Sequence, residues 1–328
     1  MEISALRLAA AIAVTISLVS VTGPAAAYTV YVSNEKGNSI TVLDSATLEV
    51  KATIPVGMRP RGIMLTKDDK YLLICASDED TVQMLDVAKR EIVGDLPSGP
   101  DPELLNIHPS GSPVYVANED DNLLTVIDLA ERKVVAEVEV GVEPEGVGIS
   151  PDGKVVISTS ETTNMAHFID TETFEITDNV LVGSRPRFAE FTADGSQLWV
   201  TSEVAGTVAV IDAKTRKIIK TIGFAVPGVQ PEHIQPVGVR ITKDGTKAFV
   251  ALGPANRVAV IDAKTFEVES YLLVGQRVWQ LAFTPDEKLL FATNGNSNDV
   301  SVIDVPSLKV IKSIAVGSAP WGVAISQK

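Results

Sequence analysis

Residues 113–153 read PVYVANEDDNLLTVIDLAERKVVAEVEVGVEPEGVGISPDG. Four short segments rich in Val, Ile and Thr stand out, at 113–118, 124–128, 133–140 and 146–150, and turn residues separate them. The closing Pro-Asp-Gly indicates a turn, because glycine accepts a positive φ. No segment keeps a 3.6-residue apolar period, so helix is not expected. The stretch predicts one small antiparallel sheet of four strands.

The same pattern recurs along the chain. An apolar strand ends on aspartate seven times, and the successive spacings are 42, 42, 42, 42, 50 and 42 residues: Asp44, Asp86, Asp128, Asp170, Asp212, Asp262 and Asp304. Four short strands per repeat, in a series of seven repeats, are typical of a β-propeller with seven blades. Each of these aspartates is expected to cap the turn that follows it through a side-chain hydrogen bond.

The two chain ends predict a closed ring. A flat solenoid is the alternative, but it would need atypical capping repeats at both ends. Here residues 28–56 supply the three outer strands of a blade, and residues 321–326 supply the inner strand that this blade lacks. Joining them removes the free sheet edges. The expected fold is therefore all-β, a single seven-bladed β-propeller over residues 28–328 with four antiparallel strands per blade.

The N-terminus has the order of a secretory signal peptide. Arg7 precedes an apolar run from Leu8 to about Val21, and the small residues 25–27 follow. Residues 1–27 are thus expected to be a signal peptide; an uncleaved anchor is the alternative. After cleavage no apolar run is long enough to span a membrane, so the mature protein is expected to be soluble. The signal peptide indicates a periplasmic protein, and we expect it to be a monomer.

The charge of the chain excludes one class of partner. The formal net charge is −14 at pH 7. An acidic surface repels nucleic acid and suits cations or basic partners, although solubility alone also explains it. The single cysteine, Cys75, lies in an apolar run and is expected to be a buried, inert thiol.

Several motifs carry a resemblance to a known family. The strand YVSN (31–34), its cognates VYVAN (114–118) and LWVTS (198–202), the VID step, the VG-x-x-P loop and the PDGK turn resemble the YVTN-type β-propeller repeat. More narrowly, the chain resembles the periplasmic propeller proteins associated with PQQ-dependent alcohol catabolism. That resemblance implies an accessory role in cofactor or metal supply, with a quinoprotein dehydrogenase or a transporter component as partner. It also implies calcium or a lanthanide as the relevant ion.

Function is expected where the copies differ, and they differ most in the loop that leads to each inner strand. The residues that flank the loop proline, or its equivalent, are, copy by copy, Arg59 and Arg61, Asp101 and Glu103, Glu143 and Glu145, Arg185 and Arg187, Gln235 and Val237, Arg277 and Trp279, and Ala319 and Trp321. Because inner strands converge on the axis of a propeller, these side chains are expected to face the mouth of its central channel.

Two adjacent copies place four carboxylates at that mouth. Hard, multivalent cations such as a lanthanide or calcium prefer oxygen ligands. The predicted ligands are Asp101, Glu103, Glu143 and Glu145, with Asp78, Asp80, Glu119 and Asp121 as secondary ligands from the adjacent loops. Two alternatives remain: the acids and arginines form a self-neutralising ion-pair network, or the arginines bind an organic anion. A network and a cation site can also share the same residues.

The fifth copy carries eight extra residues between Ile222 and Pro236. This segment is either a lid or partner contact, with Glu232 and His233 as its polar groups, or a tolerated insertion. Trp279 and Trp321 either stack on a planar ligand such as a quinone or pack around the channel.

The sequence favours a binding protein over an enzyme. It holds no C-x-x-C-H, G-x-S-x-G, H-E-x-x-H or P-loop motif. Two alternatives stay open. One is a lactonase-like hydrolase at the channel mouth, for which Glu232, His233 and Arg277 could supply the polar groups. The other is a protein-docking propeller with no small ligand.

Overall fold

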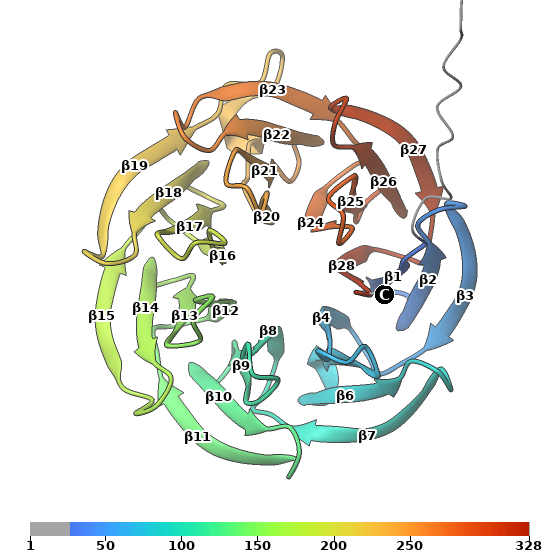
Figure 1. Cartoon of the computed structure of the whole chain (residues 1–328), viewed down its shortest axis with the longest axis vertical. Coiled ribbons are helices and arrows are strands. Elements are labelled where there is room, and N and C mark those ends of the chain that lie inside the picture. The colour runs from blue at the N-terminus through green and yellow to red at the C-terminus, as the bar shows by residue number, and fades with distance from the viewer. Residues whose placement is uncertain (1–26, 328) are drawn as a thin grey trace, which may run out of the picture.

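The computed structural model describes residues 27–327 and places seven four-stranded sheets in a ring around a central channel (Figure 1). Within this range the helical elements are two single 3₁₀ turns, η1 (Ser77–Glu79) and η2 (Pro231–His233). The predicted all-β, seven-bladed propeller is confirmed. The predicted signal peptide lies, except for Ala27, outside the described residues.

Each blade runs from an inner strand at the channel to an outer strand at the rim. From inner to outer strand, the seven sheets are β4 (Pro60–Leu65), β5 (Tyr71–Ala76), β6 (Thr81–Asp86) and β7 (Glu91–Pro97); β8 (Pro102–Ile107), β9 (Val114–Asn118), β10 (Leu123–Asp128) and β11 (Lys133–Glu139); β12 (Pro144–Ile149), β13 (Val155–Ser160), β14 (Met165–Asp170) and β15 (Ile176–Leu181); β16 (Pro186–Phe191), β17 (Gln197–Ser202), β18 (Thr207–Asp212) and β19 (Lys217–Gly223); β20 (Val239–Ile241), β21 (Lys247–Ala251), β22 (Arg257–Asp262) and β23 (Val268–Leu273); β24 (Val278–Phe283), β25 (Leu289–Asn294), β26 (Asp299–Asp304) and β27 (Lys309–Ala315); β28 (Pro320–Ile325), β1 (Thr29–Asn34), β2 (Ser39–Asp44) and β3 (Glu49–Pro55).

The ring closes as the sequence predicts. The C-terminal strand β28 pairs antiparallel with β1, in the register Val30 opposite Ile325 and Val32 opposite Val323. The seventh blade therefore combines the two ends of the chain, and the ring has no free sheet edge at its seam.

The middle strands of each blade are apolar on both faces because they pack between neighbouring blades. One apolar cluster, for example, joins Tyr115 and Val126 of one blade to Val147, Val156 and Ile169 of the next. The outer strands face water on one side and are largely exposed. Burial between blades thus explains the continuous Val and Ile runs of the middle strands.

Local hydrogen bonds fix the turns and the joints between blades. Asp128 Oδ1 accepts a bond from the backbone N–H of Glu131 at 2.7 Å, as the predicted turn cap requires. Buried hydroxyls tie several blades to the next: Thr201 donates to the carbonyl of Val237 at 2.6 Å, and Thr293 donates to that of Trp321 at 2.6 Å.

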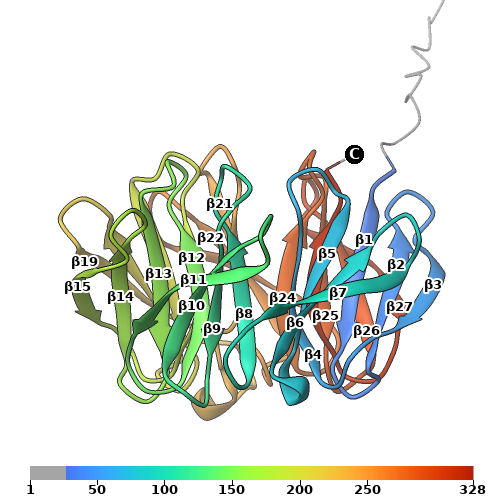
Figure 2. The ribbon, with the colours of Figure 1, turned by 90° about the horizontal axis from the view of Figure 1, so that it is seen from below.

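The ring has two distinct faces. We call the loop face the side from which the chain enters the inner strands, through loops 56–59, 98–101, 140–143, 182–185, 224–235, 274–277 and 316–319. The turn face is the opposite side, where the inner strands end, and it carries the C-terminus (Figure 2). No helix within residues 27–327 has the length and apolar character needed to cross a membrane.

Candidate functional site in the central channel

The residues predicted at the channel mouth meet at the loop face in a network of ion pairs. Arg59 lies between two acids, with Nη1 2.6 Å from Asp101 Oδ1 and Nη2 3.0 Å from Glu103 Oε1. Arg61 binds the same Glu103 oxygen at 2.7 Å and reaches Glu145 Oε1 at 3.7 Å. The second contact joins β4 to β12 past the intervening β8, so the network extends between blades that are not neighbours.

The network continues through the fourth copy. Arg187 Nη1 lies 2.5 Å from Glu145 Oε2, and its Nε lies 2.8 Å from Glu203 Oε2; Nη1 also binds Glu161. Arg185 Nε binds Glu161 Oε2 at 2.7 Å. Arg277 Nη2 binds Glu203 Oε1 at 2.7 Å. The network alternative of the sequence analysis thus describes how most of these side chains are arranged.

Two central acids of this network were missed by the sequence analysis. Glu161 and Glu203 directly follow the second strand of their blades, at the position that Glu119 holds in the third copy, and they are spaced by 42 residues. That recurrence was the available signal. Glu35 occupies the same position in the first copy and lies 3.7 Å from Arg59 Nε.

The side chains nearest the axis are buried. The exposed fraction is 0% for the Glu103 side chain, 2% for Glu145, 8% for Arg61 and 7% for Arg187. These side chains therefore fill the channel at the loop face, where an open mouth was expected. Buried charges of this kind are tolerated only when they are paired and hydrogen-bonded.

Burial and the neighbouring arginines shift the pKa values of these acids in opposite directions. Burial, reinforced by the nearby Glu145, raises the pKa of Glu161 to about 8. Burial also raises the pKa of Glu103 well above its usual range, although Arg61 opposes it. The pKa of Glu203 is lowered, because Arg187 and Arg277 together outweigh the effect of its burial. The network thus holds both a protonated and an ionised carboxyl near neutral pH.

One group of acids could hold a cation. Carboxylate oxygens of Asp101, Glu103 and Glu119 lie within 4.8 Å of one another. The buried Oε1 of Glu103 accepts from two arginines, whereas its Oε2 is buried and has no hydrogen-bond partner in the described part of the chain. Burial, followed by the charge of Glu145, raises the pKa of Glu119.

The other predicted ligands are engaged elsewhere. Glu145 serves the arginine pairs described above, and Glu143 accepts a bond from the Thr162 hydroxyl. Asp78 lies 3.6 Å from Arg59 Nη1. Asp80 and Asp121 accept backbone N–H groups, at 3.1 Å and 3.2 Å. The structure therefore gathers two of the four primary residues and one of the four secondary ones.

The two tryptophans pack against the network. Their ring centroids lie 6.1 Å apart at an interplanar angle of 36°. The guanidinium of Arg61 lies 4.7 Å from the Trp321 ring, and that of Arg277 lies 4.0 Å from the Trp279 ring. These contacts match cation–π pairing and fit the packing alternative of the sequence analysis.

The extra segment of the fifth copy is anchored at the loop face by Val226 and Ile234, which are buried. Gln235 also accepts a bond from Arg277 Nη1 at 2.6 Å. Glu232 and His233 are exposed, and their side chains make no hydrogen bond or ion pair within residues 27–327. Arg277 is instead held by Gln235 and Glu203, so no contact assembles the Glu232, His233 and Arg277 group of the hydrolase alternative.

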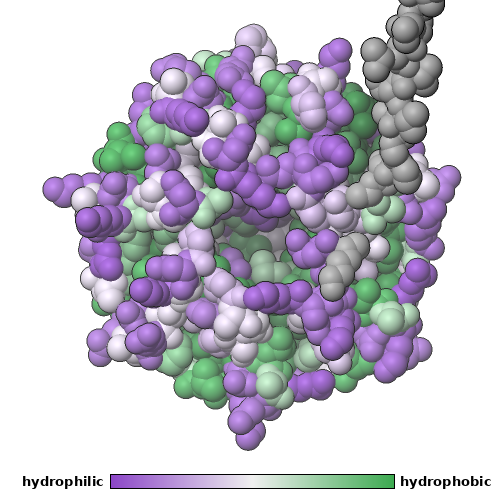
Figure 3. Space-filling view, viewed as in Figure 1, coloured by the Kyte–Doolittle hydropathy of each residue, from purple (hydrophilic) through white to green (hydrophobic). Residues whose placement is uncertain are grey.

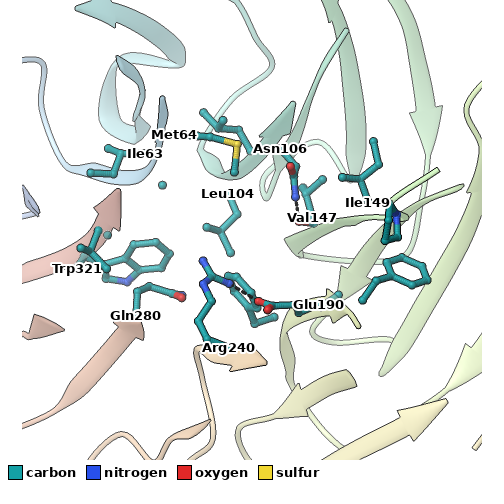
Figure 4. Close-up of a pocket in the computed structure, with 18 residues that line it drawn as sticks. Ile63, Met64, Leu104, Asn106, Val147, Ile149, Glu190, Arg240, Gln280 and Trp321 are labelled. Atoms are coloured by element: carbon teal, nitrogen blue, oxygen red, sulfur yellow. Dashed lines mark hydrogen bonds and ion pairs between the residues drawn. The ribbon is translucent and has the colours of Figure 1, made fainter. Parts of the chain in front are cut away.

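A separate cavity of about 330 Å³ occupies the channel between the inner strands, toward the turn face. Figure 3 shows the hollow at the centre of that face, and Figure 4 shows the lining. The wall is mainly apolar, and its charged residues are Glu190 and Arg240, from adjacent blades. The sequence analysis missed both, because it compared only the loops before the inner strands and not the strands' far ends.

Comparison with known families gives two matches. The family described as "Lactonase, 7-bladed beta-propeller" matches residues 24–96 and 170–312. The family described as "Cytochrome D1 heme domain" matches residues 72–182. Among curated proteins there is no match.

Several solved structures share the fold. Hydrazine synthase of Kuenenia stuttgartiensis is 23% identical with a TM-score of 0.77, over 84% of this chain and 92% of that one. Dihydro-haem d1 dehydrogenase NirN, in complex with DHE, is 16% identical with a TM-score of 0.69, over 90% and 74% of the two chains. A protein of Lactobacillus plantarum is 14% identical with a TM-score of 0.80, over 92% of this chain and all of that one. Identities this low establish the propeller fold alone.

Proposed function

The chain belongs to the family of seven-bladed β-propeller lactonases, and we propose that this member is a non-enzymatic binding protein that holds a hard cation at Asp101, Glu103 and Glu119. The observation that carries the proposal is the Glu103 carboxylate. It is fully buried, two arginines satisfy one of its oxygens, and the other oxygen lacks a partner beside two further acids.

The energetics favour a cation at this position. A buried oxygen that lacks a partner costs roughly 1–3 kcal/mol. Because burial raises the pKa values of Glu103 and Glu119, an ion that binds here must also displace protons from these carboxyls. An ion coordinated by Glu103 Oε2, Asp101 and Glu119 would satisfy that oxygen and offset the repulsion between the acids. Calcium and similar hard cations take six to eight oxygen ligands, so water would complete the coordination. Arg59 binds Asp101, so an ion must compete with it, and a trivalent lanthanide is favoured over calcium.

Thermal unfolding of the chelator-treated protein with lanthanum or calcium chloride tests the proposal. A ligand at one hundred times its Kd stabilises the folded state by about 2.7 kcal/mol, which corresponds to a rise in Tm of several degrees. We expect Asp101→Asn/Glu119→Gln to lose this rise. The matched control Glu143→Gln, an acid of the next copy outside the group, should keep it. The absence of a rise with either ion, or the same rise in the double variant, would contradict the proposal.

The resemblance to propellers of PQQ-dependent alcohol catabolism supports a specific role. We propose that the protein acts in the periplasm, as a monomer, and supplies the ion to a quinoprotein dehydrogenase or a transporter component. The test adds the lanthanum-loaded protein to metal-free dehydrogenase and follows alcohol oxidation. The loaded wild-type protein should restore activity faster than the loaded Asp101→Asn/Glu119→Gln variant. Equal rates would remove the supply role while leaving ion binding intact.

The family name supports lactone hydrolysis as a second candidate. The geometry gives it less support, because His233 is exposed and its side chain contacts neither Glu232 nor Arg277 by any hydrogen bond or ion pair. Lactone turnover that disappears in His233→Ala would establish this function. A third candidate, a propeller that only docks another protein, would show partner binding with no effect of ions or lactones.

The channel cavity offers no histidine for the haem of the second matching family, and Met64 is the one residue of a haem-ligand type in its wall. A histidine commonly holds haem iron. His108 is bonded to Ser110 and Gly153, and His167 is bonded inside its blade to Asn179 and Ser160. We therefore assign no role to haem.

A further inference from the structure

The cavity at the turn face is a second candidate site, at the other end of the channel from the ion-pair network. It continues into a wider hollow at the ends of the inner strands, where Lys243, Thr284 and Glu287 lie, and Met64 and Arg240 line both spaces. A molecule can therefore enter from the turn face. The volume of about 330 Å³ lies at the lower end of the range for small-molecule pockets, about 300–1,000 Å³.

Arg240 is held in a fixed position in the wall of this cavity. Its Nη1 donates to Glu190 Oε2 at 2.5 Å and to the carbonyl of Val239 at 3.1 Å. Glu190 is fixed in turn, because its Oε1 accepts the backbone N–H of Ile241 at 3.1 Å. The guanidinium also lies 4.7 Å from the Phe188 ring. An arginine constrained in this way loses little further entropy when it binds a ligand.

One edge of Arg240 remains available. The hydrogen bonds to Glu190 and Val239 use Nη1, and neither Nε nor Nη2 has a partner in residues 27–327. The side chain is 26% exposed, so this edge is accessible. A guanidinium edge of two parallel N–H groups matches the two oxygens of a carboxylate.

Gln280 supplies a second, independent indication. The residue is 6% exposed, its Oε1 has no hydrogen-bond partner, and its Nε2 makes no hydrogen bond in the described chain. Figure 4 shows the end of this side chain directed toward Arg240. A buried amide without a partner is costly. A half-turn about the last side-chain torsion exchanges Oε1 and Nε2, so the amino group can face the cavity and donate to a ligand oxygen there.

Apart from Asn106, whose amide is bonded to the backbone of Val147 and Ile107, the other side chains of the wall are apolar and suit a hydrocarbon body. Leu104, Val147, Ile149 and Met64 lie across the cavity from Arg240, and Trp321 lies in the wall beside Gln280 (Figure 4). We propose that the cavity binds a small organic monocarboxylate with an apolar body, whose carboxylate accepts hydrogen bonds from Arg240 and from the Nε2 amino group of Gln280. This site is independent of the cation site.

Isothermal titration of the protein with benzoate tests the inference, because benzoate combines one carboxylate with one apolar ring. We expect saturable binding, and at least tenfold weaker binding of acetate, which lacks the ring, and of benzamide, which lacks the charge. Arg240→Gln/Glu190→Gln removes the pair together, so that neither charge is left alone, and should weaken benzoate binding at least tenfold. Gln280→Leu should weaken it several-fold.

The matched control is Arg216→Gln. Arg216 also pairs with an acid, Asp178 at 3.8 Å, and also lies over an aromatic ring, but it is not among the residues that line the cavity. This variant should bind benzoate as the wild type does. The inference is overturned if benzoate shows no saturable binding, or if its affinity is unchanged in both the double variant and Gln280→Leu. Either result leaves the lanthanum experiment unaffected.

Discussion

Substitution of Glu161 should change how the stability of the protein depends on pH. Burial raises the pKa of this carboxyl from an ordinary 4.5 to about 8. A raised pKa means that the folded state keeps a proton that the unfolded state releases. The contribution to stability is therefore complete below about pH 4.5, and it is lost as pH rises through 8. At about 1.4 kcal/mol per pKa unit, the full change is on the order of 5 kcal/mol.

The assay is urea unfolding of the wild type and of Glu161→Gln at intervals from pH 5 to pH 9. Glutamine cannot titrate and resembles the protonated carboxyl. The free energy of unfolding of the wild type, minus that of the variant, should therefore fall steadily up to about pH 8. The variant also loses an acceptor for Arg185 or Arg187, which adds a constant to the difference in unfolding free energy at every pH. The test is therefore the slope of this difference against pH and not its size.

Glu203→Gln is the matched control, at the same position of the next copy. Arg187 and Arg277 lower the pKa of Glu203, so its contribution is present throughout pH 5–9 and is lost only as pH falls below this window. The difference between the wild type and Glu203→Gln should be flat. A flat difference for Glu161→Gln as well would mean that Glu161 is ionised across the window, and the assigned protonation of the network would be wrong.

Three further predictions concern stability and are checked by chemical denaturation. Arg187→Met should cost about 3–5 kcal/mol, because it leaves buried acids unpaired, whereas Arg185→Met, at a side chain 46% exposed, should cost less than about 1 kcal/mol; equal costs would contradict the burial argument. Thr201→Val should cost about 3 kcal/mol, since it removes the partner of two buried backbone groups of neighbouring blades. Gly62→Ala should cost about 1–3 kcal/mol, because its Cβ would lie 2.4 Å from a backbone oxygen of the next blade. In contrast, Gly223→Ala, whose Cβ meets no atom within 4 Å, should stay within about 0.5 kcal/mol.

The sequence predicts the scaffold well because the repeat itself carries the information. Each aspartate such as Asp128 marks the end of one strand, and a fixed spacing then locates the other strands. Closure of the ring follows from the complementary chain ends, and β28 begins only one residue before the predicted start at Trp321. These features depend on the spacing of residues along the chain, which can be read from one sequence.

The candidate sites depend on contacts that the sequence does not display. Glu203 pairs with Arg277, 74 residues away, and only the curvature of the ring brings the two together. By sequence alone Glu203 resembles an ordinary acid of an exposed loop. The cavity likewise depends on how the side chains of the inner strands fill the space around the axis. Arg240 and Gln280 occupy different positions of the repeat, so a comparison of the copies does not group them.

The channel consists of two compartments with different chemistry, and Trp321 is one contact between them. The Trp321 ring lies 4.7 Å from the guanidinium of Arg61, which binds Glu103. Trp321 also lines the apolar cavity. A charged network is a weak source of stability compared with an apolar core of the same volume. Its presence at one end of the channel, with an apolar cavity at the other, therefore argues against a role in folding alone. Arg61 and Trp321 form one route between the two sites, and the chain itself forms others, since Leu104 and Phe188 of the cavity wall directly follow Glu103 and Arg187 of the network. Any coupling free energy between the sites must be the same in both directions.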